Sequence, residues 1–255
     1  FAAVYGDNNN VTAWGKSEYG GSGVPGGLSG VKTIYSNGFA FVAVYGDNNN
    51  VTAWGRSGYG GNNTVPSGLS GVKTISSTMG AFAAVYGEND EVTAWGNNGY
   101  EGTDVPDGLS GVTAIYSNKY AFAALKEDGT VAAWGSSGYG GSVPGGLSGV
   151  KSIYSTSRAF AALKEDGMVY AWGDSSFGGS GVPTELTDGS ETVTAIYSTS
   201  GAFAALTSDG MVYAWGDSNY GGNNDDVSSL SGVTAIYSTG RAFAAVYGDN
   251  NEVAA

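Results

Sequence analysis

The sequence predicts an all-β protein, a β-propeller built from three-stranded antiparallel blades. Three observations lead to this prediction: a tandem repeat of about 40 residues, a composition rich in glycine and aromatic residues, and the absence of a helical period of 3.6 residues across enough of the chain. Of the 255 residues, 45 are glycine and 13% are aromatic. Because disordered chains are poor in aromatic residues, this mixture is typical of short strands joined by tight turns.

A phenylalanine followed by two small residues marks each repeat. After it come an acidic turn, a run ending in Ala-Trp-Gly, an aromatic residue five positions past the Trp, a glycine-rich stretch and a run such as VKTIYS. We expect all repeats to form one domain over residues 1–255. The repeats start at Phe1, Phe41, Phe82, Phe122, Phe160 and Phe203, with a partial repeat from Phe243.

Each repeat supplies three strands of five or six residues. The strands are apolar or small at nearly every position, as expected when both faces of a sheet are covered. Three repeats carry an Asp-Gly pair, which predicts a two-residue hairpin turn, and the others carry a longer turn such as YGDNNN, in which Asn takes the left-handed conformation. Radially stacked blades satisfy this pattern, whereas a sandwich would expose one face of each strand.

The order of the strands sets the number of blades. If a VKTIYS-type strand and the two strands after it form a blade, the chain holds six complete blades, and the hairpin from Phe1 to Trp14 lacks its third strand. We therefore expect seven blades, six complete and one partial. The last repeat stops one residue before its expected Trp, so we expect either a longer chain or closure from elsewhere. Open blade edges predict self-association.

Two segments carry a resemblance to a known family. FAALKEDGMVYAWGDSSFGG (160–179) and VTAIYSTSGAFAAL (193–206) resemble the repeat of the regulator of chromosome condensation family. The resemblance extends to every repeat and implies a seven-bladed propeller. In repeat length the chain is closest to the secreted propeller-type β-lactamase inhibitor, whose blades have three strands and whose connectors resemble WGSSGYGGSVPGGLSGV (134–150). The resemblance implies the fold far more strongly than the function, because one fold serves many functions.

Charge and composition limit the partners. The formal net charge of −13 repels phosphate backbones and anionic membrane surfaces, so we expect no nucleic-acid partner. No apolar run is long enough to span a bilayer. The chain has no Cys, which leaves the redox compartment open. We expect an extracellular or cell-surface location, with the cytoplasm as the alternative.

Strand direction places the candidate binding residues. The loop that precedes each FAA strand and the Trp-Gly end of the outer strand emerge at one end of a blade, here called the loop end, and the acidic turns emerge at the other, the hairpin end. Aromatic residues and Arg on rigidly held loops are common anchors of protein interfaces, so we predict binding at the loop end. Its variable loop residues are Phe39, Met79, Lys119, Tyr120, Arg158 and Arg241. Its aromatic residues after the Trp are Tyr19, Tyr59, Tyr100, Tyr139, Phe177 and Tyr220, for which packing between blades is the favoured alternative.

Other conspicuous residues have structural interpretations. We expect the six Trp side chains to wedge between blades rather than to stack on sugars. The acids of the turns serve solubility and turn chemistry, because they lack the spacing of a helix-loop-helix calcium site, and we expect no metal and no cofactor. N-glycosylation acceptor sequences start at Asn10, Asn50 and Asn62, and we interpret them as coincidental because each Thr lies in a strand.

The residue types argue against catalysis. Without His or Cys the chain lacks the commonest general base, metal ligand and thiol nucleophile, so we predict no catalytic residue. The predicted function is a non-catalytic protein-binding scaffold. The alternatives are a structural building block of a longer repeat protein or filament, and lectin-like glycan binding.

Overall fold

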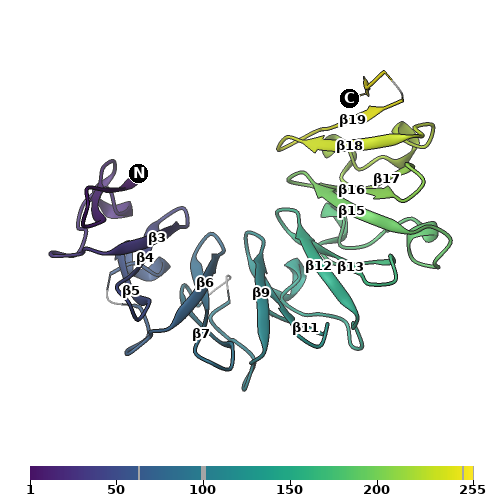
Figure 1. Cartoon of the computed structure of the whole chain (residues 1–255). Helices are drawn as coiled ribbons and strands as arrows, with labels where there is room; N and C mark the ends of the chain where they lie inside the picture. Colours follow the sequence, from purple (N-terminus) through teal and green to yellow (C-terminus); the bar gives the residue numbers. More distant parts are fainter. Residues whose placement is uncertain (63, 99–101, 249, 255) are drawn as a thin grey trace. The chain divides into compact units, whose positions relative to one another are not determined.

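The computed structural model is built almost entirely of β-strands, as the sequence predicts (Figure 1). It describes residues 1–62, 64–98, 102–248 and 250–254. In this part of the chain there are six three-stranded antiparallel sheets and one two-stranded sheet. The helical elements are single 3-10 turns of three residues. Five of the three-stranded sheets take the chain order predicted for a blade, a VKTIYS-type strand first and the Ala-Trp-Gly strand last, and the sixth has the same order with Glu252–Ala254 as its last strand.

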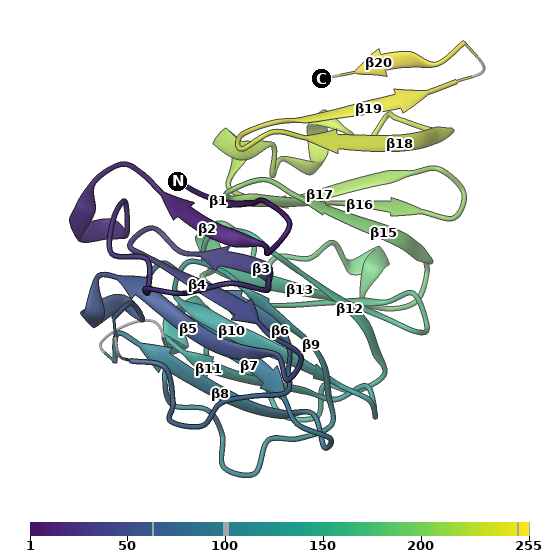
Figure 2. The ribbon, with the colours of Figure 1, turned by 60° about the vertical axis from the view of Figure 1, so that its left-hand side comes forward.

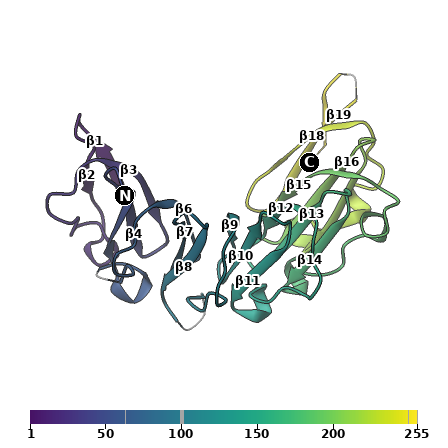
Figure 3. The same cartoon turned by 60° about the horizontal axis from the view of Figure 1, so that its bottom comes forward.

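The chain divides into two compact units, Phe1–Glu127 with Ala132–Ser136, and Asp128–Val131 with Ser137–Ala255. The hairpin Phe1–Trp14, predicted to lack a third strand, is the two-stranded sheet. The first strands of the first unit are β1 (Ala2–Tyr5), β2 (Asn10–Ala13), β3 (Val31–Ser36), β4 (Ala40–Tyr45), β5 (Asn50–Gly55), β6 (Val72–Ser77), β7 (Ala81–Tyr86) and β8 (Glu91–Gly96). It ends with β9 (Val112–Ser117), β10 (Ala121–Lys126) and β11 (Val131–Gly135), and Figure 3 shows β6, β7 and β8 in sheet order.

The second unit contains three sheets of the same kind. In each of them the middle strand is the second in the chain. The last sheet, in which β19 lies between β18 and β20, is seen most clearly in Figure 2. The strands are β12 (Val150–Ser155), β13 (Ala159–Lys164), β14 (Val169–Gly173), β15 (Val193–Ser198), β16 (Ala202–Thr207), β17 (Val212–Gly216), β18 (Val233–Ser238), β19 (Phe243–Tyr247) and β20 (Glu252–Ala254).

The hydrophobic cores lie between consecutive sheets. One core in the second unit joins Leu163 and Val169 of one sheet to Ile196, Phe203 and Trp215 of the next. The middle strands are buried at nearly every position, and their alanines let the sheets approach closely. Burial of both faces explains why these strands read as continuous apolar runs instead of alternating with polar residues.

The Trp side chains tie each sheet to the connector before it. Across the middle and outer strands a Phe pairs with a Trp, and the two rings stack, as Phe203 and Trp215 do at 5.3 Å. The indole Nε1–H of Trp215 donates to the carbonyl oxygen of Gly178 at 3.1 Å. The same bond runs from Trp54 to Gly20, Trp95 to Gly60, Trp134 to Gly102 and Trp172 to Gly140.

Burial confirms the predicted wedge for five of the six Trp residues, Trp54, Trp95, Trp134, Trp172 and Trp215. The prediction is wrong for Trp14, which is 51% exposed. Trp14 lies in the β1–β2 hairpin, and among the described residues no glycine of an earlier connector faces it. The local sequence around Trp14 matches that of the other repeats, so the local sequence does not account for its exposure.

The hairpin turns confirm one prediction and correct another. Asn9, Asn49 and Asn251 have φ between 49° and 55°, the left-handed conformation expected in the longer turns, whereas in the YGEND turn Asp90, with φ 53°, takes this conformation in place of Asn. The Asp-Gly turns are not two-residue turns. Lys164 N–H donates to Met168 O at 2.9 Å and Gly167 N–H to Lys164 O at 3.0 Å, so three residues form the turn and Gly167, with φ +81°, closes it.

The indole hydrogen bond predicts that replacing a buried Trp lowers the free energy of unfolding more than replacing the exposed Trp14 does. Trp172→Phe keeps an aromatic ring but leaves the buried Gly140 carbonyl without its donor, so we expect a loss of about 1–3 kcal/mol in the free energy of unfolding. Urea unfolding followed by circular dichroism at low protein concentration measures this loss. Trp14→Phe is the matched control and should change stability by no more than about 0.5 kcal/mol. Equal losses in both variants would contradict the role given to the bond.

Candidate functional site

In five of the repeats a single 3-10 turn that the structure describes at the loop end positions the aromatic residue that follows the Trp. The Asp174 carboxylate begins one such turn by accepting from Ser176 N–H at 2.9 Å, and Gly178 ends it with φ +88°. The Gly178 carbonyl is the one that accepts from Trp215, so this glycine serves both the core and the surface. The turns are η1 (Ser17–Tyr19), η2 (Ser57–Tyr59), η3 (Ser137–Tyr139), η4 (Ser175–Phe177) and η6 (Ser218–Tyr220).

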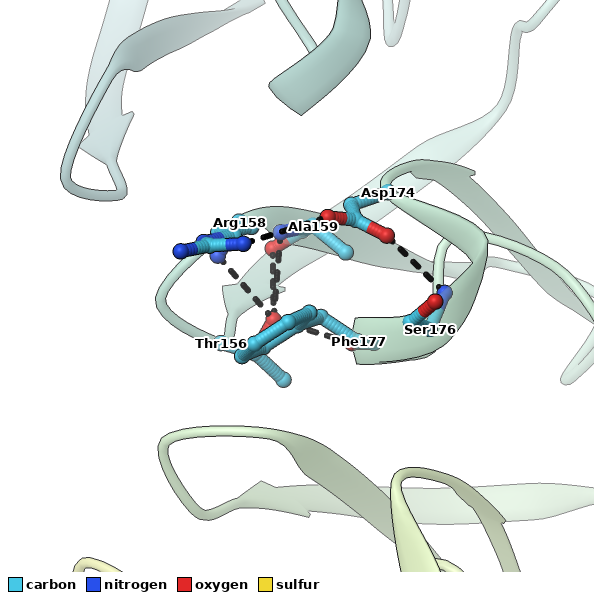
Figure 4. A network of polar contacts seen from close by, with 6 residues as sticks. All are labelled: Thr156, Arg158, Ala159, Asp174, Ser176 and Phe177. Carbon is cyan, nitrogen blue, oxygen red and sulfur yellow. Dashed lines mark hydrogen bonds and ion pairs between the residues drawn. The ribbon is translucent and has the colours of Figure 1, made fainter.

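An Asn or Thr shapes the short loop beside each turn. Thr156 Oγ1 accepts from Arg158 N–H at 3.4 Å and Ala159 N–H at 3.1 Å, and its hydroxyl donates to Phe177 O at 3.0 Å (Figure 4). The Asn37 side-chain amide makes the equivalent bonds in its loop: its oxygen accepts from Phe39 N–H, and its NH2 group donates to Tyr59 O. The loop and the 3-10 turn are therefore fixed to each other by one buried or half-buried side chain.

In the second unit these elements hold Arg158 between two rings. Its guanidinium carbon lies 4.6 Å from the Phe177 ring centroid and 5.4 Å from that of Tyr139. Asp174 faces it, with 3.7 Å between Nη1 and Oδ2. Because cation–π contacts and an ion pair act on the same group, the guanidinium is held in one orientation while its side chain stays 38% exposed.

The next loop continues the pattern with Arg241. Its guanidinium carbon lies 5.6 Å from the Tyr220 ring centroid, and Tyr220 lies 6.5 Å from Phe177. Gly201 stands where the neighbouring loops carry Arg, and a Cβ there would come within 2.8 Å of the Tyr220 ring. Residues Tyr139, Arg158, Phe177, Tyr220 and Arg241 are called the second-unit cluster below.

The first unit forms a similar cluster around Phe39. The Phe39 ring lies 5.5 Å from that of Tyr19 and 4.2 Å from that of Tyr59. The Arg56 guanidinium carbon lies 4.7 Å from the Tyr59 centroid. Lys16 lies over Tyr19, and the adjacent Glu18 carboxylate raises the pKa of Lys16 while Lys16 lowers the pKa of Glu18.

The structure thus brings most of the predicted site residues together in groups. The aromatic residues of the described 3-10 turns are half-buried, so each is partly packed against its neighbours and partly accessible. Met79 and Lys119 are exposed on adjacent loops joined by a bond from Met79 N–H to Lys119 O at 3.1 Å, and Tyr120 is half-buried. Tyr100 lies outside the described residues.

The remaining predicted residues serve the fold. Asn10 begins β2 and Asn50 begins β5, both half-buried, while the Asn62 carboxamide accepts from Gly55 N–H at 3.1 Å. The expectation that each acceptor Thr lies in a strand is wrong for Thr64, which lies in the connector between β5 and β6. Sequence reasoning missed Thr156, Asn37, Arg56 and Asp174. The signal was present for Asn37 and Thr156, since every loop opens with Asn or Thr two residues before its variable position.

The hairpin end has a different chemistry. A hollow of about 690 Å³ there is lined by acids that include Glu88, Glu91, Asp107 and Glu127. Among the described residues no three His, Cys, Asp or Glu side chains gather closely enough to hold a metal ion. All three Arg side chains, Arg56, Arg158 and Arg241, belong to the aromatic clusters of the loop end and not to the hairpin end.

No described helix has the length and apolar character needed to cross a membrane.

Comparison with known proteins identifies the repeat. Residues 150–178 and 193–221 match the family model of the regulator of chromosome condensation (RCC1) repeat. Both segments are similar to that repeat, and together they cover less than half of the chain. No curated protein sequence matches the chain. The match covers the segments that hold Arg158, Phe177 and Tyr220.

Solved structures confirm the fold. The ectodomain of the receptor kinase CR4 from Physcomitrella patens superposes with a TM-score of 0.55 at 18% identity over 87% of this chain, which spans 61% of that ectodomain. The CRINKLY WD40 ectodomain of Arabidopsis thaliana ACR4 gives 0.51 at 16% identity, with 88% and 80% covered. Prp20p of Saccharomyces cerevisiae gives 0.50 at 21% identity, with 73% and 57% covered. The sheets are therefore blades of an RCC1-like β-propeller.

The loop geometry predicts a side-chain-specific effect at Thr156. Thr156→Val keeps the volume but removes the acceptor for two backbone N–H groups and the donor to Phe177 O, so we expect a loss of about 1–3 kcal/mol in unfolding free energy. Thr156→Asn restores both roles in the manner of Asn37 and should recover most of that loss. Chemical denaturation of the three proteins provides the test, and a Val variant as stable as the parent would rule out the assigned bonds.

Proposed function

We propose that this chain is a non-catalytic protein-binding scaffold that engages its partner with the loop end. The observation that carries the proposal is the guanidinium of Arg158, held between the rings of Phe177 and Tyr139 while still 38% exposed. A side chain already fixed in one orientation loses little conformational entropy on binding, and Arg and aromatic residues are the commonest interface anchors.

The charges at the loop end indicate the chemistry of the partner. The chain carries −13 overall, yet every Arg lies against an aromatic ring at this end. Complementary charge favours an acidic segment, whose carboxylates pair with Arg158 and Arg241 while aromatic side chains pack on the exposed ring edges. We therefore propose an acidic peptide segment of a partner protein as the ligand.

The comparisons support protein binding and an exposed location. The solved Prp20p is described together with its binding to Gsp1p and histones, which gives a precedent for protein binding by an RCC1-like propeller. Two of the similar structures are receptor ectodomains, and we propose an extracellular or cell-surface location by the same similarity. We further propose that residues 1–255 act as a single repeat-array domain.

Peptide selection tests the proposed surface. Panning a random-peptide phage library on the immobilised chain should enrich peptides rich in Asp, Glu and aromatic residues. Replacing Arg158 and Arg241 together by Ala should weaken these peptides at least about tenfold, because each charge-assisted contact contributes about 1.5–3 kcal/mol. Fluorescence polarisation with labelled synthetic peptides measures the change.

The matched control removes the same charge at the hairpin end. The Lys32→Ala, Lys151→Ala double variant lowers the net charge equally and should leave peptide affinity within about twofold. Equal weakening by both double variants would mean that affinity follows net charge and not the loop end. Glycan-array binding without any peptide selection would favour the lectin-like alternative instead.

A further inference from the structure

The outer strand β8 presents an unpaired edge. It lies at the side of the sheet β6-β7-β8 and has β7 as its neighbour there (Figure 3). Backbone groups of an antiparallel strand point alternately to its two sides. Ala94 stands where β17 has Ala214, directly before the Trp, and the Ala214 N–H bonds outside its own sheet to Asn224 Oδ1 at 3.0 Å. The backbone groups of Ala94, and of Val92 two residues earlier, therefore face away from β7.

The chain covers such an edge in two other sheets but not in this one. Asn224 covers Ala214 of β17, and the Asn62 carboxamide accepts from Gly55 N–H at the end of β5. In the part of the chain that the structure describes, no group bonds the outward N–H or C=O of Val92 or Ala94. An unpaired strand edge is a template on which another strand can be added.

A hollow lies along the start of this edge. It has a volume of about 690 Å³, and its lining includes Val92 of β8 and the connector residues 105–111. Val92 and Ala94 pack against the same core as Val105 and Leu109 of the connector. Side chains opposite each other on neighbouring strands share one face of the sheet. Residues of an added strand opposite Val92 and Ala94 would therefore face the connector and the hollow.

The walls of the hollow carry uncompensated negative charge. Lys73 Nζ lies 2.5 Å from Asp90 Oδ1 and neutralises this carboxylate. Among the described residues, the side chains of the other acids make no ion pair and no hydrogen bond. These acids are Glu88, Glu91, Asp107 and Glu127. A ligand that lies here must bring positive charge. A second copy of this chain, with a net charge of −13, would bring like charges together, which disfavours pairing of β8 with itself.

We propose that β8 binds an extended, basic segment of a partner protein as a fourth strand of its sheet. The backbone of the segment bonds the outward N–H and C=O groups of Val92 and Ala94. Lys or Arg side chains at alternate positions lie over the hollow and pair with Asp107 and Glu127, because side chains two residues apart lie on the same face of a strand. Backbone bonds supply affinity in this mode of binding, and the side chains supply specificity.

The edge of β14 shows what the charges contribute. Val169 and Ala171 of β14 match Val92 and Ala94, and nothing in the described chain bonds their outward N–H groups. At this edge the hairpin carries Lys164, whose Nζ lies 2.9 Å from Asp166 Oδ2. A basic segment would meet a like charge there, so β14 offers the backbone groups without the electrostatic attraction. It is the matched control for β8.

N-methylated peptides test strand addition directly. The probe is the fluorescein-labelled peptide Lys-Val-Lys-Val-Lys, and fluorescence polarisation measures its affinity for the parent chain. Methylating the amides of the last two Lys residues removes the donors that face β8 and should weaken binding at least about tenfold. Methylating the two Val amides alters the opposite edge of the peptide and should leave affinity within about twofold. Equal effects of the two patterns, or no binding of the unmodified peptide, would overturn the proposal.

Proline at position 94 tests the same bonds from the side of the protein. Ala94→Pro removes the outward N–H but no bond to β7, and edge strands tolerate Pro. Its affinity for the unmodified peptide should fall at least about tenfold. Ala171→Pro makes the same change on β14 and should leave affinity within about twofold. Circular dichroism compares the folds, and the methylated peptides decide the matter if the first variant unfolds. Equal losses in both variants would contradict binding at β8.

Neutral substitutions test the role of the carboxylates. Asp107→Asn combined with Glu127→Gln should weaken the basic peptide at least about tenfold. Glu165→Gln combined with Glu185→Gln changes the net charge equally in the second unit and should leave affinity within about twofold. The double Arg variant of the loop end should bind this peptide as the parent does, so the outcome is independent of the proposed function. Equally tight binding of Glu-Val-Glu-Val-Glu would rule out the basic ligand.

Discussion

The hydrogen bond from a Trp indole to a glycine carbonyl is the contact on which the stacking of the sheets depends. It joins an outer strand to the connector of the repeat before it, as from Trp172 to Gly140 at 3.0 Å. The other end of a connector is fixed by backbone bonds such as Gly30 N–H to Asn8 O at 2.7 Å. With both ends fixed, a glycine-rich connector needs no regular structure of its own.

The same hydrogen bond also fixes the position of the aromatic residues at the loop end. At Gly20, Gly60, Gly140 and Gly178 the residue whose carbonyl accepts the indole also ends the 3-10 turn that carries the aromatic residue, so core and loop end share one residue in these repeats. The ring at the end of the turn cannot move without disturbing the wedge beneath it. A side chain from the short loop, such as Phe39 or Arg158, enters the space between successive rings. A rigid row of rings and a variable residue between them is a suitable arrangement for a binding surface.

The repeat pattern predicts the strands, their order within a sheet and the burial of most Trp residues, because each depends on local sequence or on contact with the next repeat. It fails for the Asp-Gly turns, since the pairing of Lys164 with Met168 decides the turn length and the dipeptide does not. It also fails for Trp14, which is 51% exposed although its local sequence matches that of the other repeats. The stacking of Arg158 between two rings joins residues 19 positions apart on either side, and no local signal predicts such a contact.

In an array of near-identical repeats, a strand could pair with the hairpin of another repeat, an ambiguity that domains without repeats do not have. The register of strand pairing is specified by side-chain pattern, and two hairpins with the same pattern offer β18 the same bonds. In most of the array, chain connectivity resolves the ambiguity, because each hairpin is tethered to its own first strand.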